Sequence, residues 1–303
     1  MDAFASELEK AKDKIASVES KTFKYGPHER HEVCSVSSTG ADKHKLTVFK
    51  QKLEVYYPPP SSSSKPPILV FHYGGGFYSG GKRFPVPREF VYANLGAFFA
   101  QRGFLVVIPD YRLVPEIVYP NPAEDSAAAL KWIVENLADS GDTENLVIMA
   151  HSAGAAIVST VLLHEPSLIE DGLRKRIKGA VLVGGPYHHD GPPSAPPDVV
   201  AHYYGTAEEK AVKLPIALLR KASEERLASL PKLLLLVSEK DAEGITLAHK
   251  DFSQLAKERL GAKVETGVAK RHNHISLNWA VGTGDGEEWA EEVAKWAKAV
   301  VSS

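Results

Sequence analysis

Ser152 has the sequence surroundings of a nucleophilic serine. The short apolar run Leu146–Met149 stops at the small-residue segment Ala150-His151-Ser152-Ala153-Gly154. The run predicts a buried strand, and the apolar residues that follow recur at helical spacing. A strand that turns into a helix within about two residues of a serine forms a nucleophile elbow, which lifts the hydroxyl above the sheet. We therefore predict that Ser152 is the nucleophile of an acyl-transfer reaction.

A glycine-rich segment upstream could bind the oxyanion that forms when a serine attacks a carbonyl. Gly74, Gly75 and Gly76 come directly after the strand predicted over 67–72. Three consecutive glycines expose backbone N–H groups that no side chain covers. A flexible turn is the alternative interpretation, but its position directly after a buried strand favours oxyanion binding.

A serine hydroxyl also needs a general base and an acid that orients the base. Glu239 and Asp241 both follow the leucine-rich strand predicted over 231–237, and Asp241 is preferred because it lies farther into the loop. His272 and His274 both follow the strand predicted over 263–268. His274 is preferred because it lies closer to the helix-forming segment that follows.

Three motifs together resemble one protein family. They are Tyr73-Gly74-Gly75-Gly76-Phe77, Asp110-Tyr111-Arg112-Leu113-Val114-Pro115-Glu116 and the serine elbow. The set resembles the hormone-sensitive-lipase-like carboxylesterases of the α/β-hydrolase class, in which the serine, the acid and the histidine also follow in this order. The resemblance implies an α/β-hydrolase fold, with a mostly parallel central sheet flanked by helices and a small helical lid. It further implies that the N–H groups of Gly75, Gly76 and Ala153 form the oxyanion hole.

The chain departs from the family pattern at three places. Tyr73 stands where the family usually has histidine, Ala150 replaces a glycine, and 238–241 matches the acid motif loosely. These departures concern the geometry of the acid and the oxyanion hole more than the class. Asp110 and Arg112 are expected to fix their loop rather than to take part in chemistry.

The spacing of strand-like and helix-like runs over 303 residues predicts one α/β domain, 1–303, with a lid formed by 1–24 and 186–230. The amphipathic N-terminal helix could equally cover an edge of the domain. Strand-like runs at 32–36 and 45–57 suit an antiparallel edge, and two short helical patterns are expected within the lid insertion. The predicted pocket residues are aromatic or apolar: Phe77, Tyr187, Tyr203, Tyr204 and Leu214.

Composition excludes several other functions. The 36 Lys and Arg residues nearly balance the 38 Asp and Glu residues, which argues against a nucleic-acid or anionic-membrane partner. The single cysteine cannot form an internal disulfide, and there is no secretory or membrane-spanning run, so we expect a soluble cytoplasmic protein. The segment His188-His189-Asp190 is not expected to bind metal, because adjacent side chains on an extended chain point in opposite directions. No metal or organic cofactor is expected, and the oligomeric state is left open.

These features predict a serine hydrolase that cleaves carboxylic esters of short or medium acyl chain through an acyl-enzyme. An amidase or arylformamidase with the same Ser152, Asp241 and His274 is the nearest alternative. A small-molecule receptor without catalysis is a second alternative, although both the serine and the histidine are present.

Overall fold

The structure is a computed structural model and describes residues 2–32, 47–60, 64–86 and 88–302. The strands are β1 (Ser20–Glu32), β2 (Thr47–Tyr56), β3 (Pro67–His72), β4 (Leu105–Pro109), β5 (Asp142–His151), β6 (Ile177–Val183), β7 (Lys232–Lys240) and β8 (Val264–Asn273). The helices are α1 (Asp2–Lys10), α2 (Lys12–Ala16), α3 (Ala93–Ala100), α4 (Asn121–Asn136), α5 (Ala153–Leu163), α6 (Asp171–Arg176), α7 (Pro197–Tyr204), α8 (Ala207–Lys213), α9 (Pro215–Lys221), α10 (Glu224–Ala228), α11 (Glu243–Leu260), α12 (Ser276–Ala280) and α13 (Glu288–Val301).

The eight strands of the described chain form one sheet in the order β1-β2-β4-β3-β5-β6-β7-β8. β1 and β2 pair antiparallel at one edge, and the strands from β4 to β8 pair parallel. The central strands are continuous apolar runs because both faces of a parallel sheet are covered by helices. In β5, for example, every residue from Leu146 to His151 is buried. The predicted fold class is confirmed.

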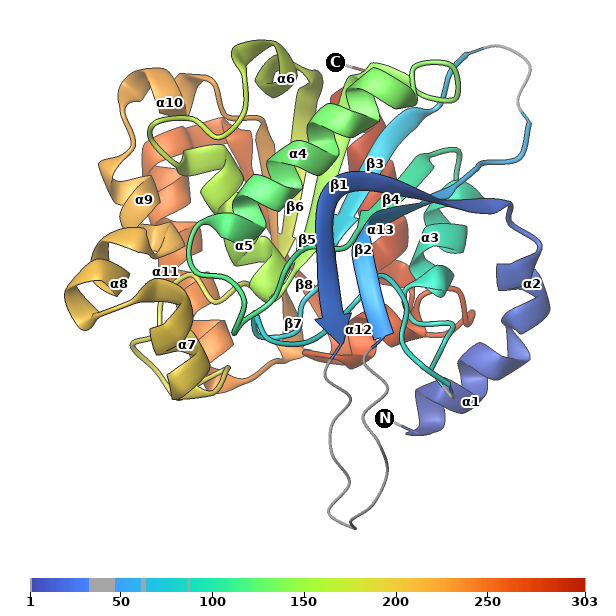
Figure 1. Cartoon of the computed structure of the whole chain (residues 1–303), viewed down its shortest axis with the longest axis horizontal. Coiled ribbons are helices and arrows are strands. Elements are labelled where there is room, and N and C mark those ends of the chain that lie inside the picture. The colour runs from blue at the N-terminus through green and yellow to red at the C-terminus, as the bar shows by residue number, and fades with distance from the viewer. Residues whose placement is uncertain (1, 33–46, 61–63, 87, 303) are drawn as a thin grey trace.

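Helices cover both faces of the sheet. Figure 1 shows α4 and α5 in front of the central strands and α13 behind them. α3 belongs to the same layer as α13, and Arg102, just after α3, forms an ion pair with Glu291 of α13. Because the parallel strands all end at one edge of the sheet, the loops that follow β3, β5, β7 and β8 meet there.

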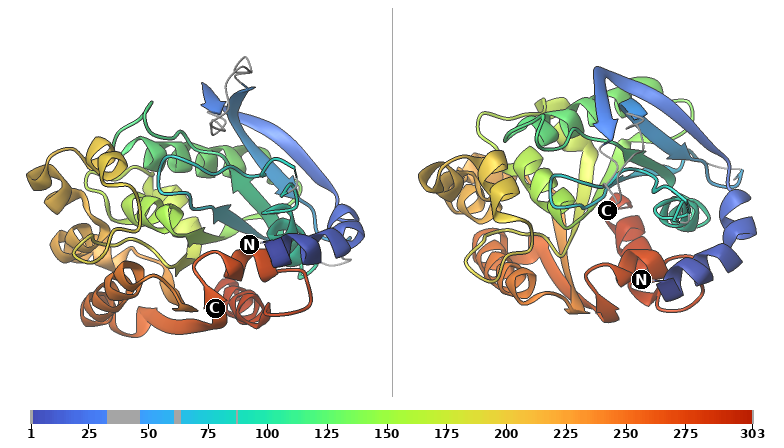
Figure 2. Two further views of the ribbon diagram at one scale, coloured as in Figure 1. Left: turned by 90° about the horizontal axis from the view of Figure 1, so that it is seen from below. Right: turned by 60° about the horizontal axis from the view of Figure 1, so that its bottom comes forward.

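The two segments predicted as a lid lie on opposite sides of the molecule. α7 to α10 gather beside α5 and α11, whereas α1 and α2 pack near α12 and α3 (Figures 1 and 2). Leu8 and Ile15 of the N-terminal helices are buried, as the amphipathic pattern predicts. The single domain and the lid remain predictions.

Several predicted elements differ in extent from the observed ones. α3 begins only at Ala93, because the chain before it, at 88–91, forms a turn. The insertion expected to hold two short helices holds four short ones, α7 to α10. Two of them, α7 and α9, have proline as their first residue, and the other two follow Thr206 and Ser223. The strand expected over 32–36 lies mostly outside the described residues, and β1 instead precedes it at Ser20–Glu32.

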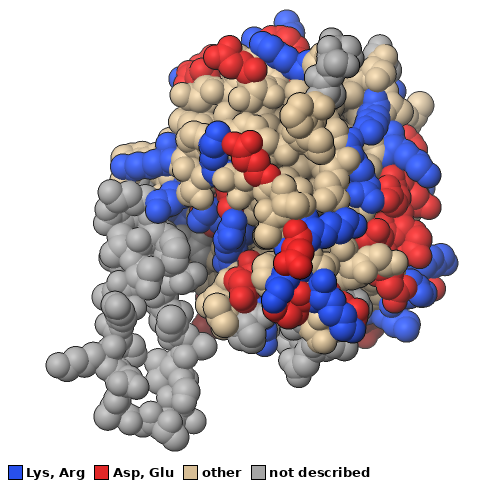
Figure 3. All heavy atoms as spheres, turned by 90° about the vertical axis from the view of Figure 1, so that its right-hand side faces the viewer, with Lys and Arg blue, Asp and Glu red and all other residues tan. Residues whose placement is uncertain are grey.

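On the face in Figure 3, Lys and Arg are interspersed with Asp and Glu, and neither sign forms a broad field. In the described part of the chain, none of the helices has the length and apolar character required to cross a bilayer.

Candidate active site

Ser152 occupies a strained turn between β5 and α5. Its backbone has φ 56° and ψ −125°, a region that a residue with a side chain rarely adopts. The Ser152 N–H donates to the carbonyl of Val183 at 2.8 Å, which extends the ladder between β5 and β6 by one residue. A Cβ at Gly154 would lie 2.4 Å from the carbonyl oxygen of His72, so only glycine allows α5 to start this close to β3. These constraints hold the serine at the end of the strand.

The structure brings Ser152, His274 and Asp241 into one chain of close polar contacts. His274 Nε2 lies 2.8 Å from Ser152 Oγ, and His274 Nδ1 lies 2.8 Å from Asp241 Oδ1. The Asp241 side chain is almost fully buried, and its Oδ1 also accepts from the N–H of Ala242 at 2.9 Å. Gly184 adopts φ +55° where a Cβ would come within 3.3 Å of both Asp241 and His274, so a glycine leaves room for their contact.

The alternative acid Glu239 and the alternative histidine His272 are not part of this chain of contacts with Ser152. Glu239 accepts from the Arg271 N–H at 2.7 Å and lies 3.8 Å from Lys270 Nζ. His272 is buried and places Nε2 2.6 Å from the carbonyl of Gly286 and Nδ1 3.2 Å from Ser276 Oγ. These contacts join Glu239 and His272 to neighbouring parts of the chain, and neither side chain has a hydrogen bond to Ser152.

Asp110 accepts hydrogen bonds from one residue before the glycine loop and one after it. Asp110 Oδ1 accepts from Tyr73 Oη and from the Lys82 N–H, each at 2.8 Å, and Oδ2 lies 2.8 Å from Lys82 Nζ. Tyr111 Oη donates to the Tyr73 carbonyl at 2.8 Å. Arg112 pairs with the buried Asp125 at 2.8 Å. The motif at 110–112 therefore fixes the loops around the site, as predicted, and Lys82 is a member of this network that the sequence did not reveal.

The three predicted oxyanion donors lie around Ser152. Gly75 and Gly76 have φ 127° and 62°, and both line the same cavity as Ser152. Ala153 is the first residue of α5, so its N–H has no partner within the helix. A Cβ at Gly74 would lie 2.7 Å from the Ser152 Cβ, which shows how closely the loop approaches the serine.

Ser152 and His274 open into a cavity of about 330 Å³. Its wall is formed by the glycine loop, the segment 194–196 and the residues after His274. The sequence did not reveal the following lining side chains: Tyr78, Ser79, Phe84, Arg88, Tyr92, His151, Ser194, Ala195, Pro196, Ile275, Asn278 and Trp279. Proximity to His274 in the chain was an available signal for Ile275, Asn278 and Trp279, whereas Phe84 and Arg88 lie in an aperiodic loop.

The five residues predicted to line the pocket do not line this cavity. Phe77 stacks on Tyr203 with ring centroids 4.3 Å apart, and Tyr204 packs edge-on to both rings. Tyr187 stacks on Phe252 at 4.1 Å. All four, like Leu214, are buried. Aromatic residues beside a site pack equally well against one another as against a ligand, and here they pack against one another.

His151, the residue before the nucleophile, lies against the ring of His274. The two ring centroids are 4.7 Å apart, and His151 is 3% exposed. Burial, together with the neighbouring His274, holds the pKa of His151 well below its ordinary value. His151 therefore contributes a neutral imidazole to the cavity wall.

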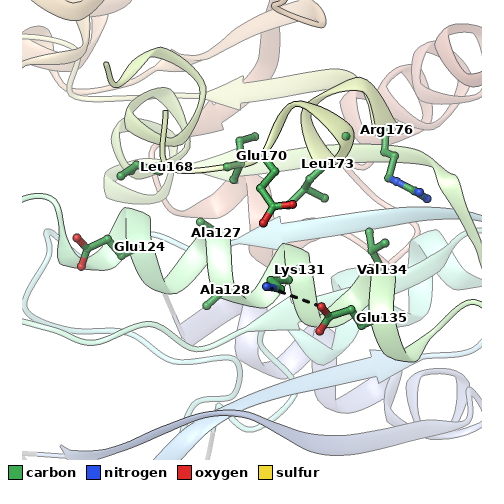
Figure 4. A pocket seen from close by; sticks show the side chains of 12 residues that line it. Glu124, Ala127, Ala128, Lys131, Val134, Glu135, Leu168, Glu170, Leu173 and Arg176 are labelled. Carbon is green, nitrogen blue, oxygen red and sulfur yellow. Dashed lines mark ion pairs between the residues drawn. The ribbon is translucent and has the colours of Figure 1, made fainter. Parts of the chain in front are cut away.

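A second cavity, of about 430 Å³, lies between α4 and α6 and shares no lining residue with the first. Figure 4 shows Lys131 and Glu135 of α4 on one side of it and Glu170 and Leu173 on the other.

Among the described residues, no group of three or more His, Cys, Asp or Glu side chains is arranged to hold a metal ion. His188 instead pairs with Asp251 at 3.1 Å.

Comparison with known proteins finds esterases among the relatives of this chain. A family model described as BD-FAE matches residues 53–176, which include the glycine loop and Ser152. A versiconal hemiacetal acetate esterase of Dothistroma septosporum is 33% identical over 117 residues, covering 37% of this chain and 33% of the relative. A probable isoprenylcysteine alpha-carbonyl methylesterase of Oryza sativa subsp. japonica is 36% identical over 74 residues, covering 24% of this chain and 17% of the relative. The chain thus matches no more than about a third of the length of these two relatives.

Solved structures match over nearly the whole chain. A Rhizomucor miehei esterase structure superposes with a TM-score of 0.70 and 20% identity, covering 99% of this chain and 88% of the other. A Pyrobaculum calidifontis esterase superposes with a TM-score of 0.68 and 20% identity, covering 100% of this chain and 93% of the other. The protein has the α/β-hydrolase fold. Over part of its length the chain is similar to the BD-FAE family model and to curated esterases, in line with the resemblance to hormone-sensitive-lipase-like carboxylesterases.

Proposed function

We propose that the protein is a serine carboxylesterase that hydrolyses small esters of short or medium acyl chain. The observation that carries the proposal is the chain of contacts Ser152–His274–Asp241, with both distances at 2.8 Å, beside a cavity. The esterases among its relatives support the same chemistry. A cavity of about 330 Å³ suits a small ester.

In the proposed reaction, His274 Nε2 takes the proton from Ser152 Oγ as the oxygen attacks the ester carbonyl. Asp241 holds the imidazole in the tautomer with the proton on Nδ1 and stabilises the imidazolium. The N–H groups of Gly75, Gly76 and Ala153 bind the oxyanion. His274 then returns the proton to the departing alcohol, and a water molecule deprotonated by the same histidine releases the acid and regenerates Ser152.

The test is a panel of 4-nitrophenyl esters from acetate to dodecanoate, with an aryl formamide alongside, run on wild type and Ser152→Ala. We expect hydrolysis of the shorter esters and a fall in kcat of roughly 10⁶ in the variant. Ser229→Ala, at an exposed serine after α10, is the matched control and should leave the rates unchanged.

The other results of this panel each contradict part of the proposal. Ester hydrolysis that survives Ser152→Ala would refute the nucleophile. A strong preference for the formamide would assign an amidase. A folded wild-type protein that turns over none of the substrates would leave the receptor hypothesis.

A further inference from the structure

The cavity beside Ser152 has an unbalanced charge. Of the described residues that line it, Arg88 alone is an arginine or lysine, and none is an aspartate or glutamate. Glu89, the next residue along the chain, does not line the cavity. His151 is neutral because burial lowers its pKa. The fixed charge of this wall is therefore positive.

Arg88 is held at the cavity by an aromatic ring rather than by a carboxylate. Its guanidinium carbon lies 5.7 Å from the centroid of the Trp279 ring, at cation–π distance. Within the described part of the chain, Arg88 forms no ion pair, whereas the nearby basic residues Lys82 and Arg83 pair with Asp110 and Glu54. The guanidinium N–H donors of Arg88 are thus available to a ligand.

The position of Trp279 relates this arginine to the proposed triad. Trp279 lies in α12, which begins two residues after His274, and Asn278 and Trp279 line the cavity with Ser152. Arg88 itself is fixed by a turn in which its N–H donates to the carbonyl of Pro85 at 2.9 Å. A group bound by Arg88 would therefore share the cavity with the acyl or alcohol part of an ester at Ser152.

A positive wall without acidic residues favours an anionic substrate. The first turn of α5, at Ser152, adds the partial positive charge of a helix N-terminus to the field of Arg88. A cleft lined by one sign of charge raises the local concentration of ligands of the opposite sign. A guanidinium binds the planar carboxylate through two parallel hydrogen bonds, which also fixes its orientation.

We infer that Arg88 is a specificity-determining residue that binds a carboxylate on the substrate, so that the preferred substrates are esters bearing a negative charge. This inference rests on the proposed esterase function. The carboxylate can belong to the acyl part, as in a monoester of a dicarboxylic acid, or to the leaving group.

The test compares matched charged and neutral esters. For the acyl part the pair is 4-nitrophenyl hydrogen adipate and 4-nitrophenyl hexanoate, and for the leaving group it is 3-carboxy-4-nitrophenyl butyrate and 4-nitrophenyl butyrate. The readout is the ratio of kcat/KM for the charged ester to that for the neutral ester, after subtraction of the uncatalysed rate. Using a ratio removes any effect of a substitution that is common to both esters.

We expect Arg88→Gln to lower this ratio about tenfold in one of the two pairs, the range of a charge-assisted hydrogen bond that is partly exposed. Arg220→Gln, at an exposed arginine of α9, is the matched control and should keep the wild-type ratio. In wild type the ratio should fall as salt rises, and in Arg88→Gln it should depend less on salt. The pair that responds identifies whether the carboxylate is on the acyl part or on the leaving group.

An equal ratio in wild type and Arg88→Gln for both pairs would overturn the inference while leaving the esterase proposal intact. Failure of the esterase proposal looks different. Wild type would then hydrolyse neither member of either pair, or Ser152→Ala would hydrolyse them as fast as wild type.

Discussion

Removing the charge of Lys82 should destabilise the protein by an amount that its contacts allow us to estimate. The Lys82 and Asp110 side chains are 11% and 6% exposed, and their charged atoms lie 2.8 Å apart. Removing one partner of a buried ion pair costs about 3–5 kcal/mol, because the other charge stays buried without compensation. Asp110 would keep the donors Tyr73 Oη and the backbone N–H of residue 82, so Lys82→Met should cost about 2–4 kcal/mol.

This loss should be visible in thermal and chemical unfolding. With an entropy of unfolding of about 2.1 cal/mol/K per residue, a chain of 303 residues loses roughly 1.6 °C of Tm for each kcal/mol. Lys82→Met should therefore lower Tm by roughly 3–6 °C. The free energy of unfolding is best measured by urea denaturation followed by tryptophan fluorescence.

Lys270→Met provides the matched control. Lys270 is 75% exposed and lies 3.8 Å from Glu239, so removing its charge should cost well under about 1 kcal/mol. The double variant Lys82→Met with Asp110→Asn should recover part of the stability, because it removes the buried carboxylate charge together with the ammonium charge. If Lys82→Met is as stable as Lys270→Met, the reasoning about the buried ion pair is refuted.

Three further predictions concern the candidate triad, the elbow and acid stability. Asp241→Asn should lower kcat by about three to four orders of magnitude, because His274 would then adopt the wrong tautomer. The kcat of Glu239→Gln should stay within about twofold of wild type, and similar losses in both variants would argue against Asp241 as the acid. Gly154→Ala should sharply reduce folded yield, because its Cβ would lie 2.4 Å from the His72 carbonyl oxygen. In the control Gly172→Ala the new Cβ would meet nothing within 4 Å, so Tm should rise slightly. Equal yields and Tm values for the two variants would contradict the close approach of α5 to β3. Burial lowers the pKa of His72 to about 3, below its value in the unfolded chain, so the stability that depends on neutral His72 is complete above about pH 6.5 and is lost as pH falls. His72→Asn should therefore remove about 2 kcal/mol of the decrease in unfolding free energy between about pH 7 and pH 5. An unchanged decrease would count against a neutral His72.

Short-range patterns were sufficient for most of the fold. The apolar run before Ser152 forms β5, and the helical spacing after Gly154 forms α5. Such patterns work because burial on both faces of a parallel sheet and on one side of a helix imposes a period on neighbouring residues. They were less successful in 186–230, where short helices carry few turns and so little periodicity.

The sequence by itself determined the strand-turn-helix setting of Ser152, the glycine loop and the order of serine, acid and histidine. Each of these depends on residues adjacent in the chain. Only the tertiary structure decided that His274 rather than His272 reaches Ser152, since 122 residues separate the serine from the histidine, and that Asp241 rather than Glu239 reaches His274.

The tertiary structure also decided which side chains surround the serine. It buried Tyr187 and Tyr203 in aromatic stacks and placed Arg88 beside Trp279 in the cavity wall. No local pattern distinguishes an aromatic ring that packs against another ring from one that packs against a ligand. That outcome depends on how the loops at the ends of separate strands fold over one another, and contacts between residues far apart in the chain determine it.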